Sequence, residues 1–441
     1  MTSSVSVRLD QTREAAERIV HQVTERLTDP EEVAATASSP ENADHFPGVP
    51  AHSPWAGLSL GEGHTGVALL FAELSHSAPR HAMTAHRHLS VAARSPSSPH
   101  MRHGLFGGLP SLAFAARAAQ RTPQEYATLL ARLDERVNAT LHSLLETERE
   151  RLDTGRPGAR MDSYDVIRGA SGLGRYLLLR RPLHQTVLID ALTYLVRLTE
   201  PVKVHGHTVP GWWVPGSPSL GLDESYPHGH FNLGLAHGIC GPLALLAASW
   251  EAGVRVDGHE AAITRIVGHL LEAGPPWTGT LRFDEFTSGS RPRPPHGRTA
   301  WCYGTAGVAR ALQMAGNALD RPEWRKQAVD AMASALAAES LEVTNSGLCH
   351  GWAGVLQITW RMARESSDER LTAKLPLLAE RITAAHDPAA PFGFYYTNPA
   401  MRQAQHRAGC LEGAAGIALA LHCYAADTEP ASAWDSALML S

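Results

Sequence analysis

A tract of the form Gly-x-x-Gly, followed each time by an apolar run, occurs seven times in this chain of 441 residues. The first glycines of the tracts are Gly63, Gly104, Gly169, Gly238, Gly304, Gly351 and Gly413. One such tract says little, but seven in the same phase form an internal repeat, and a repeat restricts the fold more than any local pattern does. We therefore expect one continuous repeat region rather than several unrelated domains.

Amphipathic segments alternate with the apolar runs that follow the glycines. In residues 260–272, for example, Ile263, Ile266, Val267 and Leu270 have the spacing of a half-buried helix. Similar segments are residues 10–27, 82–94, 123–151, 183–199, 321–338 and 368–386. The pattern predicts an all-α protein with seven buried inner helices and seven amphipathic outer helices that cover them. The glycines would permit close backbone approach where the inner helices begin.

The predicted domain division places an N-terminal helix and a connecting loop in residues 1–54 and the repeat region in residues 55–441. The loop, residues 30–54, is rich in Pro, Ser and Ala. Two further loops, residues 201–232 and 274–298, are unusually long, and long loops in a compact domain often surround a binding site. We expect both at the mouth of a site.

Charge and composition exclude several classes of protein. The net charge of -5, from 39 basic and 44 acidic residues, provides no basic surface for nucleic acid. The sequence contains no apolar run of about 18 residues, so we expect no transmembrane segment, and the N-terminus lacks the apolar core of a signal peptide. Five cysteines, an odd number, are typical of a reduced compartment. A cytoplasmic protein is expected.

Alignment of the repeats by their first glycine reveals a column of polar residues. The residue before that glycine is Glu62, His103, Arg168, His237, Tyr303, His350 or Glu412. One position earlier, Cys302 and Cys349 stand in successive repeats. If the inner helices run parallel, these residues gather at one end, where the helices begin.

Cys302, Cys349 and His350 would then converge from two neighbouring repeats. Two thiolates and an imidazole without a fourth protein ligand describe an open zinc site of the catalytic type. The 47-residue gap between the cysteines excludes a zinc finger, whose ligands come in closely spaced pairs. The alternative is a pair of buried, inert cysteines. Cys240, Cys410 and Cys423 are interpreted as small core residues.

Three further residues have two interpretations each. His237 is either a general acid or base that faces the metal or a structural histidine. Asp165, four residues before Gly169, is either a functional carboxylate or a structural one, as a helix cap or a partner of Arg168. Arg298, four residues before Cys302, is either a loop cation or a group that stabilises an anion.

The stretches 236–241, 301–307 and 349–354, with sequences Ala-His-Gly-Ile-Cys-Gly, Trp-Cys-Tyr-Gly-Thr-Ala-Gly and Cys-His-Gly-Trp-Ala-Gly, resemble the signature of lanthionine synthetase C-like proteins. The resemblance covers about residues 55–425. It implies an α,α-toroid of seven inner and seven outer helices and one Zn²⁺ per chain. The implied zinc ligands are Cys302, Cys349 and His350, and the implied active-site residues are His237, Asp165, Arg298 and Tyr303.

The activity that this resemblance implies is zinc-dependent lanthipeptide cyclisation. Cysteine thiolates of a dehydrated precursor peptide, with leader and core, add to dehydroalanine or dehydrobutyrine and form lanthionine or methyllanthionine thioether rings. The implied partners are that peptide and, within a biosynthetic complex at the membrane, a separate dehydratase and an exporter. A peripheral membrane location within that complex is the alternative to a free cytoplasmic enzyme.

Three other functions were weighed against cyclisation. A thiol- or glutathione-binding scaffold of the same family would need no ring-closing chemistry. A zinc-dependent protein prenyltransferase also alkylates thiols, but that class has a carboxylate among its zinc ligands. An α/α-barrel glycosidase needs two opposed carboxylates, and nothing in the sequence pairs Glu62 with Glu412.

Overall fold

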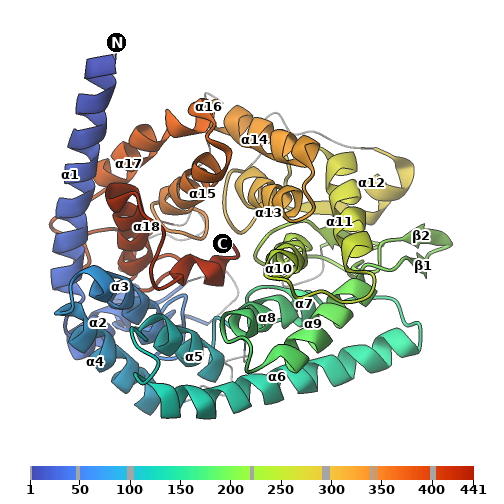
Figure 1. Cartoon of the computed structure of the whole chain (residues 1–441), viewed down its shortest axis with the longest axis horizontal. Coiled ribbons are helices and arrows are strands. Elements are labelled where there is room, and N and C mark those ends of the chain that lie inside the picture. The colour runs from blue at the N-terminus through green and yellow to red at the C-terminus, as the bar shows by residue number, and fades with distance from the viewer. Residues whose placement is uncertain are drawn as a thin grey trace. The chain divides into compact units, whose positions relative to one another are not determined.

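The computed structural model describes residues 2–45, 50–96, 104–218, 223–290, 298–337, 341, 343, 345–397 and 404–441. The chain divides into two compact units, and Figure 1 labels the helices and strands that they contain. Unit 1 contains Met1–Arg136 and Val343–Asp435, and unit 2 contains Val137–Glu342 and Ser436–Ser441. Both are built from helices in two layers, as the repeat predicts.

The inner layer of unit 1 contains four helices that each follow a glycine tract. They are α3 (His64–Ser77), α5 (Leu109–Ala118), α15 (Trp352–Ser366) and α18 (Ala414–Ala426). They pack side by side in the order α15, α18, α3, α5. Most residues of each helix are buried, on all faces of the helix. The helix of the last repeat, α18, therefore packs against that of the first, α3.

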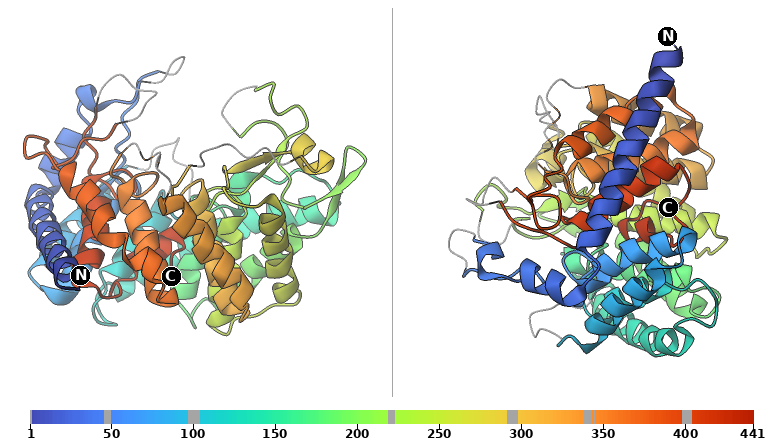
Figure 2. Two further views of the ribbon diagram at one scale, coloured as in Figure 1. Left: turned by 90° about the horizontal axis from the view of Figure 1, so that it is seen from above. Right: turned by 90° about the vertical axis from the view of Figure 1, so that its left-hand side faces the viewer.

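The outer layer of unit 1 covers these helices with amphipathic ones. The helix α1 (Thr2–Arg26) packs on α17 (Leu375–Ala384) and α18, and α4 (His81–Arg94) packs on α3 and α5 (Figure 2). The segment predicted as one helix over 368–386 forms two, α16 (Glu369–Thr372) and α17, because Pro376 is tolerated only in the first turn of a new helix.

The N-terminal region differs from the predicted helix and connecting loop. Part of that loop forms α2 (Pro30–Ala37) and the short 3-10 helix η1 (Pro40–Asn42). Asp29 caps α2, since its Oδ1 accepts the N–H groups of Glu31 and Glu32 at 2.9 and 3.2 Å. The domain boundary between residues 54 and 55 remains a prediction.

Unit 2 repeats the two-layer plan with three inner helices. These are α8 (Ala170–Leu179), α10 (Cys240–Glu251) and α13 (Thr305–Ala318), packed in that order. The outer helices α9 (Gln185–Leu198), α11 (His259–Ala273) and α14 (Pro322–Ala337) cover them. Further helices are α7 (Met161–Tyr164) of unit 2, and α6 (Ala127–Asp153) and the 3-10 helix η2 (Trp434–Leu438), whose residues fall in both units.

The two long loops of unit 2 are more ordered than expected. Strands β1 (Val202–Val204) and β2 (His207–Val209) form a hairpin, and β3 (His230–Asn232) of the first loop pairs antiparallel with β4 (Thr280–Arg282) of the second, which continues into α12 (Phe283–Ser288). Trp212 and Trp213 of the first loop lie buried within this structure.

The second glycine of a repeat tract lies in the first turn of the helix that follows and bonds back to the preceding turn. The N–H groups of Gly354 and Gly416 each donate to a carbonyl seven residues earlier, that of Gly347 and Gly409, at 3.3 Å. These bonds satisfy N–H groups that a helix start leaves unpaired. The preceding turn lies so close that a Cβ on Gly354 would be 2.0 Å from the oxygen of Leu348. The sequence predicts close backbone approach between neighbouring inner helices. At Gly354 the close approach is instead between the helix start and the turn that precedes it.

The second repeat is out of phase with the prediction. The helix α5 begins at Leu109, and Gly108, with φ of 73°, is its N-cap, so the tract that begins at Gly104 ends before the helix. His103, which the alignment placed in the polar column, lies outside the described residues.

Within the described part of the chain, no helix combines the length and hydropathy needed to span a membrane.

Candidate functional site

In each unit, the turns that precede the inner helices are joined by backbone hydrogen bonds. In unit 2 the N–H of Leu235 donates to the carbonyl of Cys302 at 3.1 Å. In unit 1 the N–H of Cys349 donates to the carbonyl of Leu411 at 2.8 Å. Each bond links the turns of two successive repeats. The inner helices of a unit therefore begin at the same end, and the polar column residues of that unit gather there.

Two of these turns have the same construction. The sequence Asn-x-Gly-Leu-x-His-Gly begins at Asn232 and again at Asn345, and the histidines are His237 and His350. Each asparagine Oδ1 accepts the N–H of the glycine two residues later at 3.0 Å. Each asparagine carbonyl accepts an N–H from the following helix start, at 2.9 and 3.0 Å. The two histidines thus occupy equivalent positions, and this longer repeat was visible in the sequence but missed.

His237 and Asp165 form a close pair in unit 2. His237 Nδ1 lies 2.6 Å from Asp165 Oδ2. The other oxygen, Oδ1, accepts the backbone N–H groups of Arg168 and Gly169 at 2.7 and 2.8 Å, at the start of α8. Asp165 is 1% exposed, whereas His237 is partly exposed. The carboxylate is therefore both the helix cap and the partner of the imidazole, and Nδ1–H donates to it, which leaves Nε2 for chemistry.

Tyr303 lies beside this pair. Its ring stacks on that of His237 with centroids 6.2 Å apart, and its hydroxyl accepts a hydrogen bond from Asn232 Nδ2 at 3.2 Å. Asn232 ends β3, so the pairing of the two long loops helps to fix Tyr303. Of the four predicted catalytic residues, the structure brings His237, Asp165 and Tyr303 together.

Arg298, the fourth, has a different environment. Its backbone carbonyl accepts the N–H of Thr305 at 3.1 Å and so helps to cap α13, while its side chain is exposed. Among the described residues, no hydrogen bond or ion pair joins its guanidinium to His237 or Asp165. Its role stays a prediction, and residues 291–297 of the same loop lie outside the described residues.

In unit 1, Cys349 and His350 occupy the turn before α15, and both are partly exposed. His350 Nε2 lies 3.3 Å from the hydroxyl of Tyr396 and 3.9 Å from Glu412 Oε1. Burial and the neighbouring Glu412 carboxylate raise the pKa of the Tyr396 phenol, so its hydroxyl stays protonated at neutral pH and is able to accept the Nε2–H of His350. No sequence pattern indicates Tyr396, which follows His350 by 46 residues in an irregular segment.

Glu62 and Glu412, which nothing in the sequence paired, meet at the starts of α3 and α18. Glu62 Oε1 accepts the backbone N–H of Glu412 at 3.2 Å. Burial and the charge of Glu412 raise the pKa of Glu62 to about 8. Burial likewise raises the pKa of Glu412, against the lowering effects of His350 and Arg407. A neutral Glu62 beside Glu412 avoids two adjacent buried charges.

The other cysteines lie in the core, as expected. Cys240, Cys410 and Cys423 are buried, and burial raises the pKa of each thiol, that of Cys410 to about 12. They are therefore protonated and unreactive at neutral pH. Cys302, in unit 2, is also buried, with 5% exposed.

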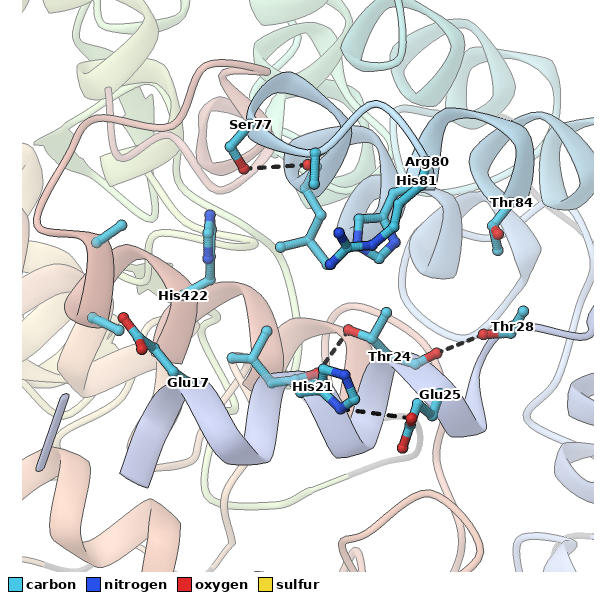
Figure 3. A pocket seen from close by; sticks show the side chains of 15 residues that line it. Glu17, His21, Thr24, Glu25, Thr28, Ser77, Arg80, His81, Thr84 and His422 are labelled. Atoms are coloured by element: carbon cyan, nitrogen blue, oxygen red, sulfur yellow. Dashed lines mark hydrogen bonds and ion pairs between the residues drawn. The ribbon is translucent and has the colours of Figure 1, made fainter. Parts of the chain in front are cut away.

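A cavity of about 510 Å³ in unit 1 lies away from the predicted site (Figure 3). It is lined by α1 residues such as His21 and by Leu74, Ser77 and His422, near the C-terminal ends of α3 and α18. The polar column, in contrast, precedes the N-terminal ends of these helices. The cavity is therefore not a part of the candidate active site.

Known proteins match this chain by family, by sequence and by structure. Residues 54–439 match the family described as lanthionine synthetase C-like protein. The nisin biosynthesis protein NisC of Lactococcus lactis subsp. lactis is 25% identical over 314 residues, which cover 68% of this chain and 72% of that protein. The structure of a nisin cyclase matches with a TM-score of 0.73 at 21% identity, over 98% of each chain.

The structural match confirms the predicted fold, the α,α-toroid. The family match extends over most of the sequence and includes every repeat from Gly63 to Gly413. The chain belongs to the lanthionine synthetase C-like family.

Proposed function

We propose that this chain is a zinc-dependent lanthipeptide cyclase that forms lanthionine and methyllanthionine rings in a dehydrated precursor peptide. The observation that carries the proposal is the family match over residues 54–439. Two relatives, named as a nisin biosynthesis protein and a nisin cyclase, support it. The close pair of His237 and Asp165 adds a group suited to proton transfer.

The proposed zinc ligands are Cys302, Cys349 and His350, for one ion per chain. Two thiols and an imidazole are a donor set that zinc takes in proteins, and three protein ligands leave a fourth position for a substrate sulfur. His350 supports this assignment, because its Nε2 faces Tyr396 and its Nδ1 is left for a metal. Bound zinc would keep a coordinated substrate thiol deprotonated near neutral pH.

In the proposed reaction, the substrate thiolate adds to the β-carbon of dehydroalanine or dehydrobutyrine. A C–S bond forms, the alkene π pair moves toward the neighbouring carbonyl to give an enolate, and the α-carbon then takes a proton. We assign that transfer to His237 Nε2, which would accept the proton that the substrate thiol loses and return it to the α-carbon, while Asp165, 2.6 Å from Nδ1, fixes the orientation of the ring. Asp165 itself is bound to two backbone N–H groups, which keep it in place.

Tyr303 and Arg298 have supporting roles in the proposal. The Tyr303 ring packs beside His237 and forms a wall of the site. Arg298 would offset the negative charge that develops on the enolate, provided that its exposed side chain turns inward when the peptide binds. The proposed location is cytoplasmic, with a dehydratase and an exporter as partners in a complex.

The test is ring closure of a dehydrated precursor peptide by the purified chain. Each ring consumes one free thiol, so alkylation of the remaining thiols followed by mass spectrometry counts the rings. We expect closure by the wild type and none above background by Cys349→Ala. A zinc-loaded wild type that closes no ring in several dehydrated peptides would contradict the proposal and would favour the thiol-binding scaffold.

A further inference from the structure

The surroundings of His350 indicate how this imidazole is oriented. Its Nε2 is 3.3 Å from the Tyr396 hydroxyl and 3.9 Å from Glu412 Oε1. A metal-binding histidine uses one ring nitrogen for the metal and donates the N–H of the other to a protein group. With Nε2 turned toward Tyr396 and Glu412, the nitrogen available to a metal is Nδ1.

Tyr396 is itself fixed on two sides. Its backbone pairs with Gln405 in an isolated antiparallel bridge, with N–H to O distances of 2.8 and 2.9 Å. The guanidinium of Arg407 lies over its ring, 5.1 Å from the centroid. Tyr396 is 4% exposed. The hydroxyl that meets His350 therefore has little freedom to move.

The N-terminal segment supports Arg407 in turn. Asp44 Oδ1 accepts hydrogen bonds from Arg407 Nη2 and, at 2.9 Å, from Gln405 Nε2. Both Asp44 and Arg407 are buried. A continuous series of contacts thus leads from Asp44 through Arg407 and Tyr396 to His350. Asp44 precedes residue 54, where the match to the family begins.

We propose that Tyr396 and Glu412 position His350 for metal binding through Nδ1, and that Asp44 of the N-terminal segment supports this arrangement through Arg407. The inference rests on the proposed function, in which His350 is a zinc ligand. Tyr396, Glu412, Asp44 and Arg407 do not touch the reacting atoms in the proposal, so all four are positioning residues. Their contribution is to pre-orient a ligand, which strengthens metal binding.

Zinc affinity, measured by competition with a chromophoric chelator, tests the inference without any peptide substrate. Loss of a group that orients a metal ligand typically weakens binding by about 10- to 100-fold. We expect Tyr396→Phe and Glu412→Gln each to raise the zinc dissociation constant within that range. Tyr395→Phe is the matched control, because Tyr395 is 40% exposed and its ring lies beside His406 rather than His350.

The absorption spectrum of the Co²⁺-substituted protein separates positioning from a general loss of structure. We expect Tyr396→Phe to alter the ligand-field bands while the thiolate-to-cobalt bands persist. Asp44→Asn should weaken zinc binding by a smaller factor, and its effect should largely disappear in the Tyr396→Phe background, because both act on the same contact. Thermal melting identifies any variant that fails to fold.

Two failures are distinguishable. If wild type binds zinc, His350→Ala loses it, and both Tyr396→Phe and Glu412→Gln bind zinc like Tyr395→Phe, the positioning inference is wrong and the proposed function stands. If the wild type binds no zinc, the proposed function fails and the inference fails with it.

Discussion

Replacement of Asp165 by asparagine separates the two tasks of this carboxylate. Oδ1 accepts the N–H groups of Arg168 and Gly169, and Oδ2 accepts Nδ1–H of His237. An asparagine keeps one oxygen for the backbone N–H groups but presents an amide NH₂ to the imidazole. The ring must then place its proton on Nε2, the nitrogen that the proposed reaction uses. Asp165 is 1% exposed, so solvent is not placed to replace the lost bond.

The expected effect on the rate follows from the strength of that bond. Hydrogen bonds to a charged group contribute about 1.5–3 kcal/mol, and the 2.6 Å distance places this one among them. At about 1.4 kcal/mol for each factor of ten, Asp165→Asn should slow ring closure by about 10- to 150-fold. Because the cap is kept, the free energy of unfolding should fall by less than about 1 kcal/mol, whereas Asp165→Ala also loses the cap, at about 1–2 kcal/mol more.

The assay is single-turnover ring closure, followed by thiol alkylation and mass spectrometry, beside urea unfolding of the same samples. Asp162→Asn is the matched control, since this nearby carboxylate pairs with Arg160 instead, and its rate should equal that of the wild type. An Asp165→Asn rate within twofold of wild type, with an unchanged pH profile, would refute the orienting role and leave Asp165 as a helix cap.

Three further predictions concern stability. Gly416→Ala should lower the free energy of unfolding by more than about 3 kcal/mol, because its Cβ would lie 1.8 Å from a carbonyl oxygen. Gly268→Ala, on an open face of α11, should instead raise the free energy of unfolding by up to about 1 kcal/mol. Urea unfolding of both variants measures these two changes. Burial lowers the pKa of His64 and of His88 to about 4, so between pH 6.5 and 4 the unfolded chain binds more protons, and stability should fall with pH by up to about 3 kcal/mol for each ring; a fall of the same size in His64→Phe would contradict this. Asp435→Asn removes the buried carboxylate that pairs with the buried Arg361 and, among the described residues, leaves this guanidinium with only the exposed Glu429, at 3.6 Å. The substitution should cost about 3–5 kcal/mol, and a loss below about 1 kcal/mol in urea unfolding would disprove it.

Much of this fold could be predicted from the sequence because the apolar runs and the glycine tracts are local signals. The tract at Gly104 was aligned in the wrong phase because Gly107 and Gly108 are adjacent, and the structure shows that Gly108 is the N-cap of α5. The helix α2 was missed although Asp29 followed by Pro30 is a recognised start signal. The pairing of β3 with β4 joins segments about 50 residues apart and has no local signature.

The candidate site was predictable where its residues share a repeat position. His237 and His350 stand in one column because their turns have the same construction, around Asn232 and Asn345. Tyr396 could not be found in this way. It belongs to no repeat position, and it reaches His350 only through an irregular segment that packs there.

The most direct test of the central claim is the zinc content of the purified chain, in wild type and in Cys302→Ala and Cys349→Ala. The proposed site predicts about one zinc per wild-type chain and its loss from both variants, with the helical circular dichroism retained. Zinc that stays bound in both variants, or a freshly prepared wild type without zinc, would contradict a shared metal site formed by these repeats.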